Sequence, residues 1–257
     1  MATPQPRQAP ETHILVEGVT LAYGDFVIQH DLNFRIKRGD VFIIMGGSGC
    51  GKSTVMRSLT GLLQPKAGQI HYDGVSFWEA PAADRAQTMR RFGVMYQSGA
   101  LWSSMTLLEN VALPLEQYTS LSPAQIHDIA AYKLALVGLR GFDDFYPSEI
   151  SGGMQKRVGV VRAMVLDPDV LFFDEPSAGL DPLSARLLDE LILELRDSLG
   201  TTMVVVTHEL ASIFTIGDDS VFLDPETKTM LTTGNPRELR DHSDIPKVRS
   251  FLNRGEA

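Results

Sequence analysis

The 257-residue chain is poor in cysteine and has no surplus of positive charge. Its one cysteine cannot close an internal disulfide, and the opening stretch MATPQPRQAPETH lacks the basic and apolar regions of a secretion signal. With 23 basic against 32 acidic residues, the formal charge of −9 gives no basic face for neutralising nucleic-acid phosphates. No uncharged apolar run approaches the roughly 18 residues that a membrane-spanning helix needs. We therefore expect a cytosolic protein without a nucleic-acid partner, for which any membrane role requires another protein.

Two kinds of apolar pattern predict two kinds of strand. In HILVEGVTLAYG (13–24) and VIQHDLNFRIKRG (27–39), apolar and polar residues alternate between glycines, as in antiparallel strands with one solvated face. Four later runs are apolar without alternation and suit strands buried on both faces of a parallel sheet: VFIIM (41–45), FGVMY (92–96), VLFF (170–173) and MVVV (203–206). Helical segments separate these runs. The expected fold class is α/β, with a core sheet between helices and an N-terminal antiparallel β-lobe.

A helical lobe interrupts the strand pattern at about residues 98–165. In it, Ser122-Pro123-Ala124-Gln125 is a capping box with proline at the first helical position, and apolar residues follow at helical spacing. Further on, SVFLDPETKTMLTTG predicts a hairpin. We assign residues 1–12 to a disordered tail, 13–235 to a single domain that contains the helical lobe, and 236–257 to a charged C-terminal tail.

The run GGSGCGKS follows the apolar run VFIIM and precedes a helical pattern. It satisfies G-x-x-x-x-G-K-[ST], the phosphate-binding loop, in the strand-to-helix context that this motif requires. Glycines let successive backbone N–H groups point inward, Lys52 supplies a cation for the β- and γ-phosphates, and the Ser53 hydroxyl can ligate Mg²⁺. We expect a nucleotide to be bound by Gly46, Gly47, Ser48, Gly49, Cys50, Gly51, Lys52, Ser53 and Thr54.

Two acids, Asp174 and Glu175, follow directly after the run VLFF. Asp174 is placed to hold Mg²⁺ through water, and Glu175 can polarise an attacking water as general base. An isolated Asp-Glu pair is more often a solvated strand end. The apolar run before the pair and the phosphate loop upstream favour the catalytic interpretation.

Polar residues or the phosphate loop stand where each predicted parallel strand ends, at Gly46, Gln97, Asp174 and His208. Because the carboxyl ends of parallel strands meet at one edge of a sheet, where open α/β folds bind ligands, these segments should converge on one crevice. We interpret His208 as a γ-phosphate contact that positions Glu175 and the water. Gln97 would sense Mg²⁺ or the water at the helical lobe. The predicted catalytic residues are Glu175, His208, Lys52 and Gln97, and the predicted metal ligands are Ser53, Gln97 and Asp174.

A second glycine-rich helix start, Ser151-Gly152-Gly153, lies between Gln97 and the Asp-Glu pair in the stretch EISGGMQKR. Its free N–H groups and serine hydroxyl form a second anion site. The order of Tyr23, GGSGCGKS, Gln97, ISGGM, VLFFDE, SAGLD and His208 resembles that of the ATP-binding-cassette (ABC) ATPases, from about residue 13 to residue 234. The resemblance implies an ABC-type P-loop NTPase fold with a mixed core sheet, and ATP and Mg²⁺ as cofactors.

The same resemblance implies a head-to-tail homodimer in which each ATP lies between one chain's P-loop and the other's Ser151-Gly152-Gly153. It also implies that Tyr23 stacks on adenine and that Asp181 faces its counterpart across the interface. A surface aromatic and a helix N-cap before Pro182 are the structural alternatives. The usual signature ends in glutamine, so Met154 removes a polar group that could touch the partner's nucleotide.

Two segments, QSGALWSSMTLLENVALPLEQYTSL and PSEISGGMQKRVGVVRAMVLDP, are similar to the ATPase of Mla/Mce-type lipid transporters. This resemblance implies a motor at the cytoplasmic face of the inner membrane that powers a permease docked between the helical lobe and the ATPase core. The cargo would be phospholipid that moves between the inner and outer membranes. A Mce-domain protein is an expected partner, and a small STAS-domain protein binds some relatives. Residues 236–257 would either reach across the dimer, as in relatives, or fray.

Three other functions stay open. The chain could serve an ABC importer or exporter with a different cargo. A soluble ABC ATPase that acts on DNA or ribosomes would be expected to show fused cassettes, a coiled coil or a basic surface. A nucleotide-binding regulator without turnover would be expected to lack Glu175 or His208, and both are present. Co-purification with a multi-span membrane protein would separate the transport motor from the last two.

Overall fold

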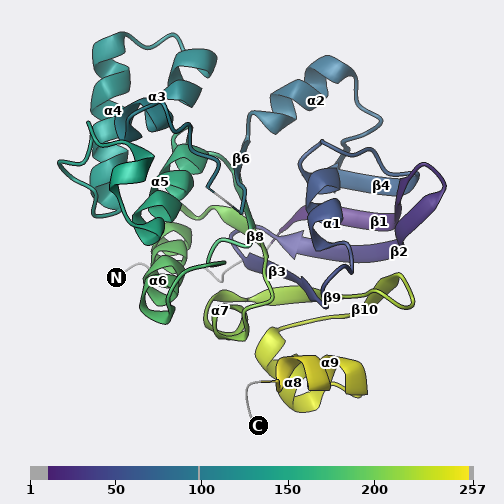
Figure 1. The fold of residues 1–257 in the computed structure, drawn as a ribbon. Coiled ribbons are helices and arrows are strands. Elements are labelled where there is room, and N and C mark those ends of the chain that lie inside the picture. The colour runs from purple at the N-terminus through teal and green to yellow at the C-terminus, as the bar shows by residue number, and fades with distance from the viewer. Residues whose placement is uncertain (1–10, 98, 255–257) are drawn as a thin grey trace, which may run out of the picture.

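The computed structural model describes residues 11–97 and 99–254, which form two sheets and a helical lobe (Figure 1). The larger sheet has six strands in the order β10-β9-β3-β8-β7-β6. Five of them run parallel, and β10 is antiparallel to β9. The strands are β3 (Val41–Gly46), β6 (Phe92–Met95), β7 (Val170–Asp174), β8 (Thr202–Val206), β9 (Asp219–Asp224) and β10 (Thr229–Thr233). The mixed core sheet that the sequence predicts is confirmed.

The smaller sheet is antiparallel and has the order β2-β1-β4-β5. It contains β1 (Thr12–Tyr23), β2 (Phe26–Lys37), β4 (Ala67–Tyr72) and β5 (Val75–Ser76). The first two strands were predicted from alternation, whereas β4 and β5 were not, because short strands between glycines carry too few residues to show a period. The helices α1 (Lys52–Leu59) and α2 (Ala82–Met89) lie on this side of the molecule (Figure 1).

The helical lobe lies at the opposite side of the core sheet, where Figure 1 draws it in teal. It consists of α3 (Leu107–Tyr118), α4 (Pro123–Leu136), the short 3₁₀ helix η1 (Pro147–Glu149) and α5 (Gly152–Met164). The capping box predicted for α4 is present, since Ser122 and Gln125 exchange backbone-to-side-chain hydrogen bonds of 3.4 and 2.9 Å. Gly138, at φ +74°, follows the end of this helix.

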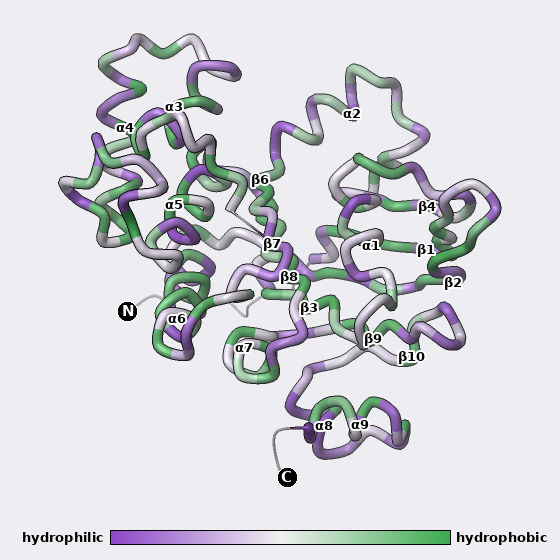
Figure 2. The backbone as a smooth tube through the Cα atoms, viewed as in Figure 1, coloured by the Kyte–Doolittle hydropathy of each residue, from purple (hydrophilic) through white to green (hydrophobic). Residues whose placement is uncertain are grey.

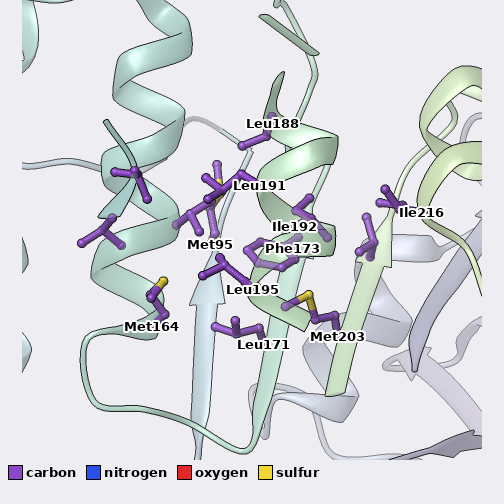
Figure 3. Close-up of a cluster of buried hydrophobic side chains, with 14 of the residues drawn as sticks. Met95, Met164, Leu171, Phe173, Leu188, Leu191, Ile192, Leu195, Met203 and Ile216 are labelled. Atoms are coloured by element: carbon purple, nitrogen blue, oxygen red, sulfur yellow. The ribbon is translucent and has the colours of Figure 1, made fainter. Parts of the chain in front are cut away.

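The parallel strands bury both faces, so alternate residues enter two different hydrophobic clusters. On one face, residues such as Ile43 and Met203 pack against the helical lobe, α6 (Pro182–Leu199) and α7 (Leu210–Ile216). Figure 3 shows part of that cluster, with Phe173 between Ile192 and Leu195 of α6 and Met95 of β6. On the other face, Phe42 and its neighbours pack against α1 and the antiparallel sheet. Figure 2 shows the resulting hydrophobic centre.

After the hairpin, the chain forms α8 (Pro236–His242) and α9 (Pro246–Leu252), which lie below β9 and β10 in Figure 1. Val248, Phe251 and Leu252 of α9 are buried in the cluster on the helical side of the core sheet. The sequence analysis did not predict these helices, because their charged residues hide the few apolar positions. The predicted domain boundaries stay a prediction. Most of the predicted N-terminal tail lies outside the described residues, and β1 begins at Thr12.

None of the helices within residues 11–97 and 99–254 combines the length and the apolar character needed to cross a membrane.

Candidate functional site

A cavity of about 570 Å³ lies at the carboxyl-terminal edge of the core sheet. It collects residues from β2, the loop after β3, the loops after β6, β7 and β8, and the C-terminal segment. The lining residues are Ile28, Gly46, Gly47, Ser48, Gly49, Gly51, Lys52, Ser53, Thr54, Gln97, Glu175, His208, Phe251 and Arg254. Of the four strand-end residues expected to meet, Gly46, Gln97 and His208 line this cavity. Asp174 is not among the described residues that line it, but its neighbour Glu175 is, and Asp174 accepts a hydrogen bond from the lining residue Ser53.

In the loop between β3 and α1, two glycines leave no room for a side chain. Gly46 has φ +147°, and a Cβ atom there would lie 2.4 Å from the Leu223 carbonyl oxygen. Gly51 caps α1 at φ +94°, and its Cβ would lie 2.6 Å from Ile28. The loop can thus present backbone N–H groups at the start of α1. Cys50 is buried, and burial raises the pKa of its thiol, so only its backbone can contribute to a phosphate site.

Lys52 and Ser53 lie at the start of α1, within the cavity lining. The Lys52 Nζ atom donates hydrogen bonds to the carbonyl oxygens of Gly46 (3.1 Å) and Gly47 (3.3 Å), which holds the ammonium group over the loop. The Ser53 hydroxyl donates to Asp174 Oδ1 at 3.3 Å. Burial raises the pKa of Asp174, and the hydrogen bond from Ser53 acts against that rise. A hydroxyl and a carboxylate side by side are hard oxygen donors that fit Mg²⁺, which takes few protein ligands when phosphates supply the rest.

Glu175 follows β7 with a left-handed backbone, φ +49°, which is uncommon outside glycine. Its N–H donates to the Val206 carbonyl oxygen at 2.8 Å, so the strained turn is tied to β8. The Glu175 Oε1 atom lies 2.8 Å from His208 Nδ1. Its other oxygen, Oε2, is buried and has no hydrogen-bond partner among the described residues. One oxygen is thus oriented by the histidine, which fixes the direction of the carboxylate at the cavity wall.

Two basic residues of α5, Lys156 and Arg162, form a clamp that ties this helix to the loop that carries Gln97. The Lys156 Nζ atom donates a hydrogen bond to the Gln97 carbonyl oxygen, and Arg162 donates to the carbonyl oxygens of Gly99 (2.8 Å) and Ala100 (2.7 Å). Burial lowers the pKa of both Lys156 and Arg162. No motif in the sequence predicts this clamp. The local sequence shows only that α5 contains three basic residues, Lys156, Arg157 and Arg162, and not which of them contact the Gln97 loop.

The second glycine motif is not part of the cavity wall: Ser151, Gly152 and Gly153 are not among the described residues that line it. Ser151 caps α5, and its hydroxyl accepts the Met154 N–H at 3.3 Å. A Cβ atom on Gly153 would lie 3.3 Å from Ser184, so this helix start adjoins the first turn of α6. That the motif completes the cavity of a partner chain stays a prediction.

Asp181 is the N-cap of α6, the structural alternative weighed from the sequence. It accepts the backbone N–H groups of Leu183 and Ser184, both at 3.1 Å, and the Ser184 hydroxyl at 2.5 Å. These hydrogen bonds lower the pKa of its carboxyl group. A contact across a dimer interface stays a prediction for Asp181.

Tyr23 lies at the end of β1, and its hydroxyl accepts a hydrogen bond of 3.2 Å from Arg57. The side chain is about half exposed, but it is not among the described residues that line the cavity. Ile28 on the neighbouring strand β2 is part of the lining instead. Stacking of Tyr23 on adenine therefore stays a prediction.

Comparison with known proteins identifies the family. The ABC transporter family model matches residues 29–178, which include the phosphate loop, Gln97, the Ser-Gly-Gly motif and the Asp-Glu pair. This chain belongs to the ABC transporter family. It is an ATP-binding ATPase subunit of that family.

Several relatives match the chain over most of its length. A protein of Mycobacterium tuberculosis described as a probable ribonucleotide transport ATP-binding protein, mkl, is 41% identical over 97% of this chain and 70% of its own length. The intermembrane phospholipid transport system ATP-binding protein MlaF of Escherichia coli K12 is 38% identical over 91% of this chain and 86% of its own. MlaF of Haemophilus influenzae is 36% identical over 95% of this chain and 91% of its own length.

Solved ABC structures share the fold. A dimeric ATP-binding cassette in a post-hydrolysis state, bound to ADP and Pi, has a TM-score of 0.77 and 27% identity over 86% of this chain and 98% of its own. The cbiO1 protein from Clostridium perfringens, part of an ABC transporter complex, has a TM-score of 0.82 and 26% identity. The match covers 95% of this chain and 96% of that protein. These matches agree with the fold built above from the strand patterns.

Proposed function

We propose that this ABC ATPase works as a head-to-tail homodimer that powers a membrane permease, with phospholipid moved between the inner and outer membranes as its cargo. The subunit would sit at the cytoplasmic face of the inner membrane, held by the permease. Partners of the same complex would be a Mce-domain protein and, as in some relatives, a small STAS-domain protein. The dimer is supported by one observation: the described lining of the cavity includes the phosphate loop, Glu175 and His208 but not Ser151.

The hydrolytic step follows from the groups that line the cavity. The glycine loop, Lys52 and Thr54 would bind the phosphates of ATP, which brings the γ-phosphate to the side where Glu175 and His208 lie. The Glu175 carboxylate accepts a proton from the attacking water, while His208 Nδ1 lies 2.8 Å from Oε1 and so fixes the direction of the carboxylate. Burial of the cavity under a partner chain would exclude bulk water from this step.

Ser53, Asp174 and Gln97 would hold Mg²⁺, which would neutralise charge on the β- and γ-phosphates. The hydroxyl and carboxylate oxygens of the first two already lie 3.3 Å apart. Gln97 is positioned through its own backbone carbonyl, because Lys156 donates a hydrogen bond to it.

The cargo is proposed from the relatives, since none of the residues argued above can contact it. The MlaF proteins support phospholipid. The mycobacterial relative, named for ribonucleotide transport and 41% identical, favours a second candidate cargo. Purifying the chain with its membrane subunits, and measuring ATP-driven transfer of labelled phospholipid against uptake of labelled ribonucleotide in vesicles, separates the two.

Complementation between two inactive variants tests the shared site. Lys52→Ala disables the phosphate loop, and Ser151→Ala disables the second anion site, so each variant alone should lose most of its ATPase activity. In an equal mixture, about half of the dimers pair one chain of each kind and rebuild one intact site. We expect activity in the mixture well above that of either variant. Activity no higher than the variants alone, with both folded by thermal melting, contradicts the shared site.

A further inference from the structure

The C-terminal segment reaches the nucleotide cavity of its own chain. Phe251 and Arg254 line the cavity together with the phosphate loop, although about 200 residues separate them from Lys52 in the sequence. Neither residue belongs to a motif of the ABC resemblance.

The strand β9 explains how this segment arrives there. In the core sheet, β9 lies parallel to β3, with Leu223 opposite Gly46, so it runs directly beside the start of the phosphate loop. The helix α9 packs on β9: the ring of Phe251 meets Phe222 edge-on, with centroids 5.1 Å apart. Lys247 adds an ion pair to the buried Asp224 at the end of β9. Packing against β9 thus fixes the end of α9 next to the phosphate loop.

Arg254 follows α9 and is held in place by that aromatic ring. Its guanidinium carbon lies 4.5 Å from the centroid of Phe251, within the range of a cation–π contact. No carboxylate among the described residues lies within ion-pair distance of Arg254, so its charge is not neutralised in this part of the chain. An arginine stacked on an aromatic ring keeps its N–H fork free to bind an anion in two places at once.

An arginine in this cavity would add to the positive charge and N–H donors that the phosphate loop and Lys52 offer a triphosphate. Among its charged lining residues, Lys52 is already bonded to two loop carbonyl oxygens, and Glu175 contributes a negative charge. ATP brings several more negative charges, which must be matched by nearby cations or N–H donors. We propose that Arg254 contacts the phosphates of ATP from within the same chain, as a binding residue outside the known ABC motifs. This inference rests on the ATPase function proposed above.

The test measures the ATP dissociation constant of purified full-length variants by titration with a fluorescent ATP analogue. We expect Arg254→Ala to weaken binding roughly tenfold, as the loss of a charge-assisted hydrogen bond should, and Arg254→Lys to recover part of it. Arg249→Ala is the matched control, because Arg249 is an exposed arginine on α9 that does not line the cavity. Its dissociation constant should equal that of the wild type.

Each other outcome is decisive. Wild-type protein that binds no ATP overturns both the proposed function and this contact. Wild-type ATP affinity in a folded Arg254→Ala variant overturns the proposed contact and leaves the ATPase function standing. Tighter ATP binding by this variant also overturns the contact, because it would mean that the C-terminal segment blocks the cavity. The loss should persist in a Ser151→Ala background. A loss that disappears there would place Arg254 at the partner's site instead, against the proposal.

Discussion

At the residue scale, Glu175 combines three features that point to chemistry. Its left-handed backbone costs on the order of 1 kcal/mol relative to an ordinary conformation, and such strain persists only where surrounding structure holds it. The bond to Val206 and the contact with His208 are that surrounding structure. The strained turn aims the carboxylate at the cavity, which a relaxed strand end would not do.

Asp189 on α6 is a buried carboxyl group outside the nucleotide cavity. Burial raises its pKa to about 6, although the Ser212 hydroxyl donates to it at 2.8 Å. Between the unfolded pKa of 3.8 and this value, the folded state keeps a proton that the unfolded state has lost, so the free energy of unfolding falls as pH rises. We predict that Asp189→Asn abolishes this decrease in the free energy of unfolding. The decrease amounts to up to about 3 kcal/mol between a pH below the unfolded pKa and a pH above the folded pKa.

Urea unfolding at about pH 4 and about pH 7.5 measures this difference. Asp241→Asn is the control, because hydrogen bonding to Arg240 lowers the pKa of the exposed Asp241, and the sign of its pH dependence is opposite. An Asp189→Asn variant with the same pH dependence as the wild type would show that Asp189 ionises freely in the fold.

At the scale of elements, the clamp makes α5 and the Gln97 loop one unit. Lys156→Met keeps the aliphatic stem but leaves a carbonyl oxygen without its donor, a loss of about 1–3 kcal/mol that should displace Gln97. We predict that the ATPase kcat falls about tenfold, with a smaller change in KM for ATP, and that Lys156→Arg restores most of it. Steady-state kinetics provide the measurement.

Lys133→Met is the matched control for this change. Lys133 is an equally buried lysine on α4 of the same lobe, but it pairs with Asp167 and does not touch the Gln97 loop. Its loss should lower the melting temperature and leave kcat near that of the wild type. An equal fall of kcat in both variants would mean that general weakening of the lobe, and not the clamp, limits turnover.

Elements differ in how far the sequence predicts them. Fully apolar runs such as VFIIM and MVVV became parallel strands because a strand buried on both faces must be apolar at every position. The helix α4 was predicted from its capping box, which is a purely local signal. In contrast, α9 buries only Val248, Phe251 and Leu252, and its stability comes from β9, which local sequence cannot show.

At the scale of the whole molecule, one chain carries a phosphate loop that lines the cavity and a Ser-Gly-Gly helix start that does not. We predict that Glu175→Gln retains ATP binding, loses nearly all hydrolysis, and accumulates as a dimer because the base is gone while both phosphate sites remain. Light scattering with and without ATP measures the mass. Adding Ser151→Ala should return the variant to the mass of a monomer.

A monomeric Glu175→Gln protein at saturating ATP contradicts the sandwich, and so does hydrolysis near the wild-type rate, which would remove Glu175 from the role of base.

The sequence alone determined the family, the order of the motifs and the meeting of four strand ends at one edge. Each depends on residues close in sequence or on a general rule of parallel sheets, and so needs no knowledge of how distant parts pack. Only the tertiary structure decided that Cys50 is buried, that Lys156 and Arg162 hold the Gln97 loop, and that Arg254 reaches the phosphate loop. Contacts between distant segments depend on side-chain packing across the core, and no local pattern in the chain encodes that packing.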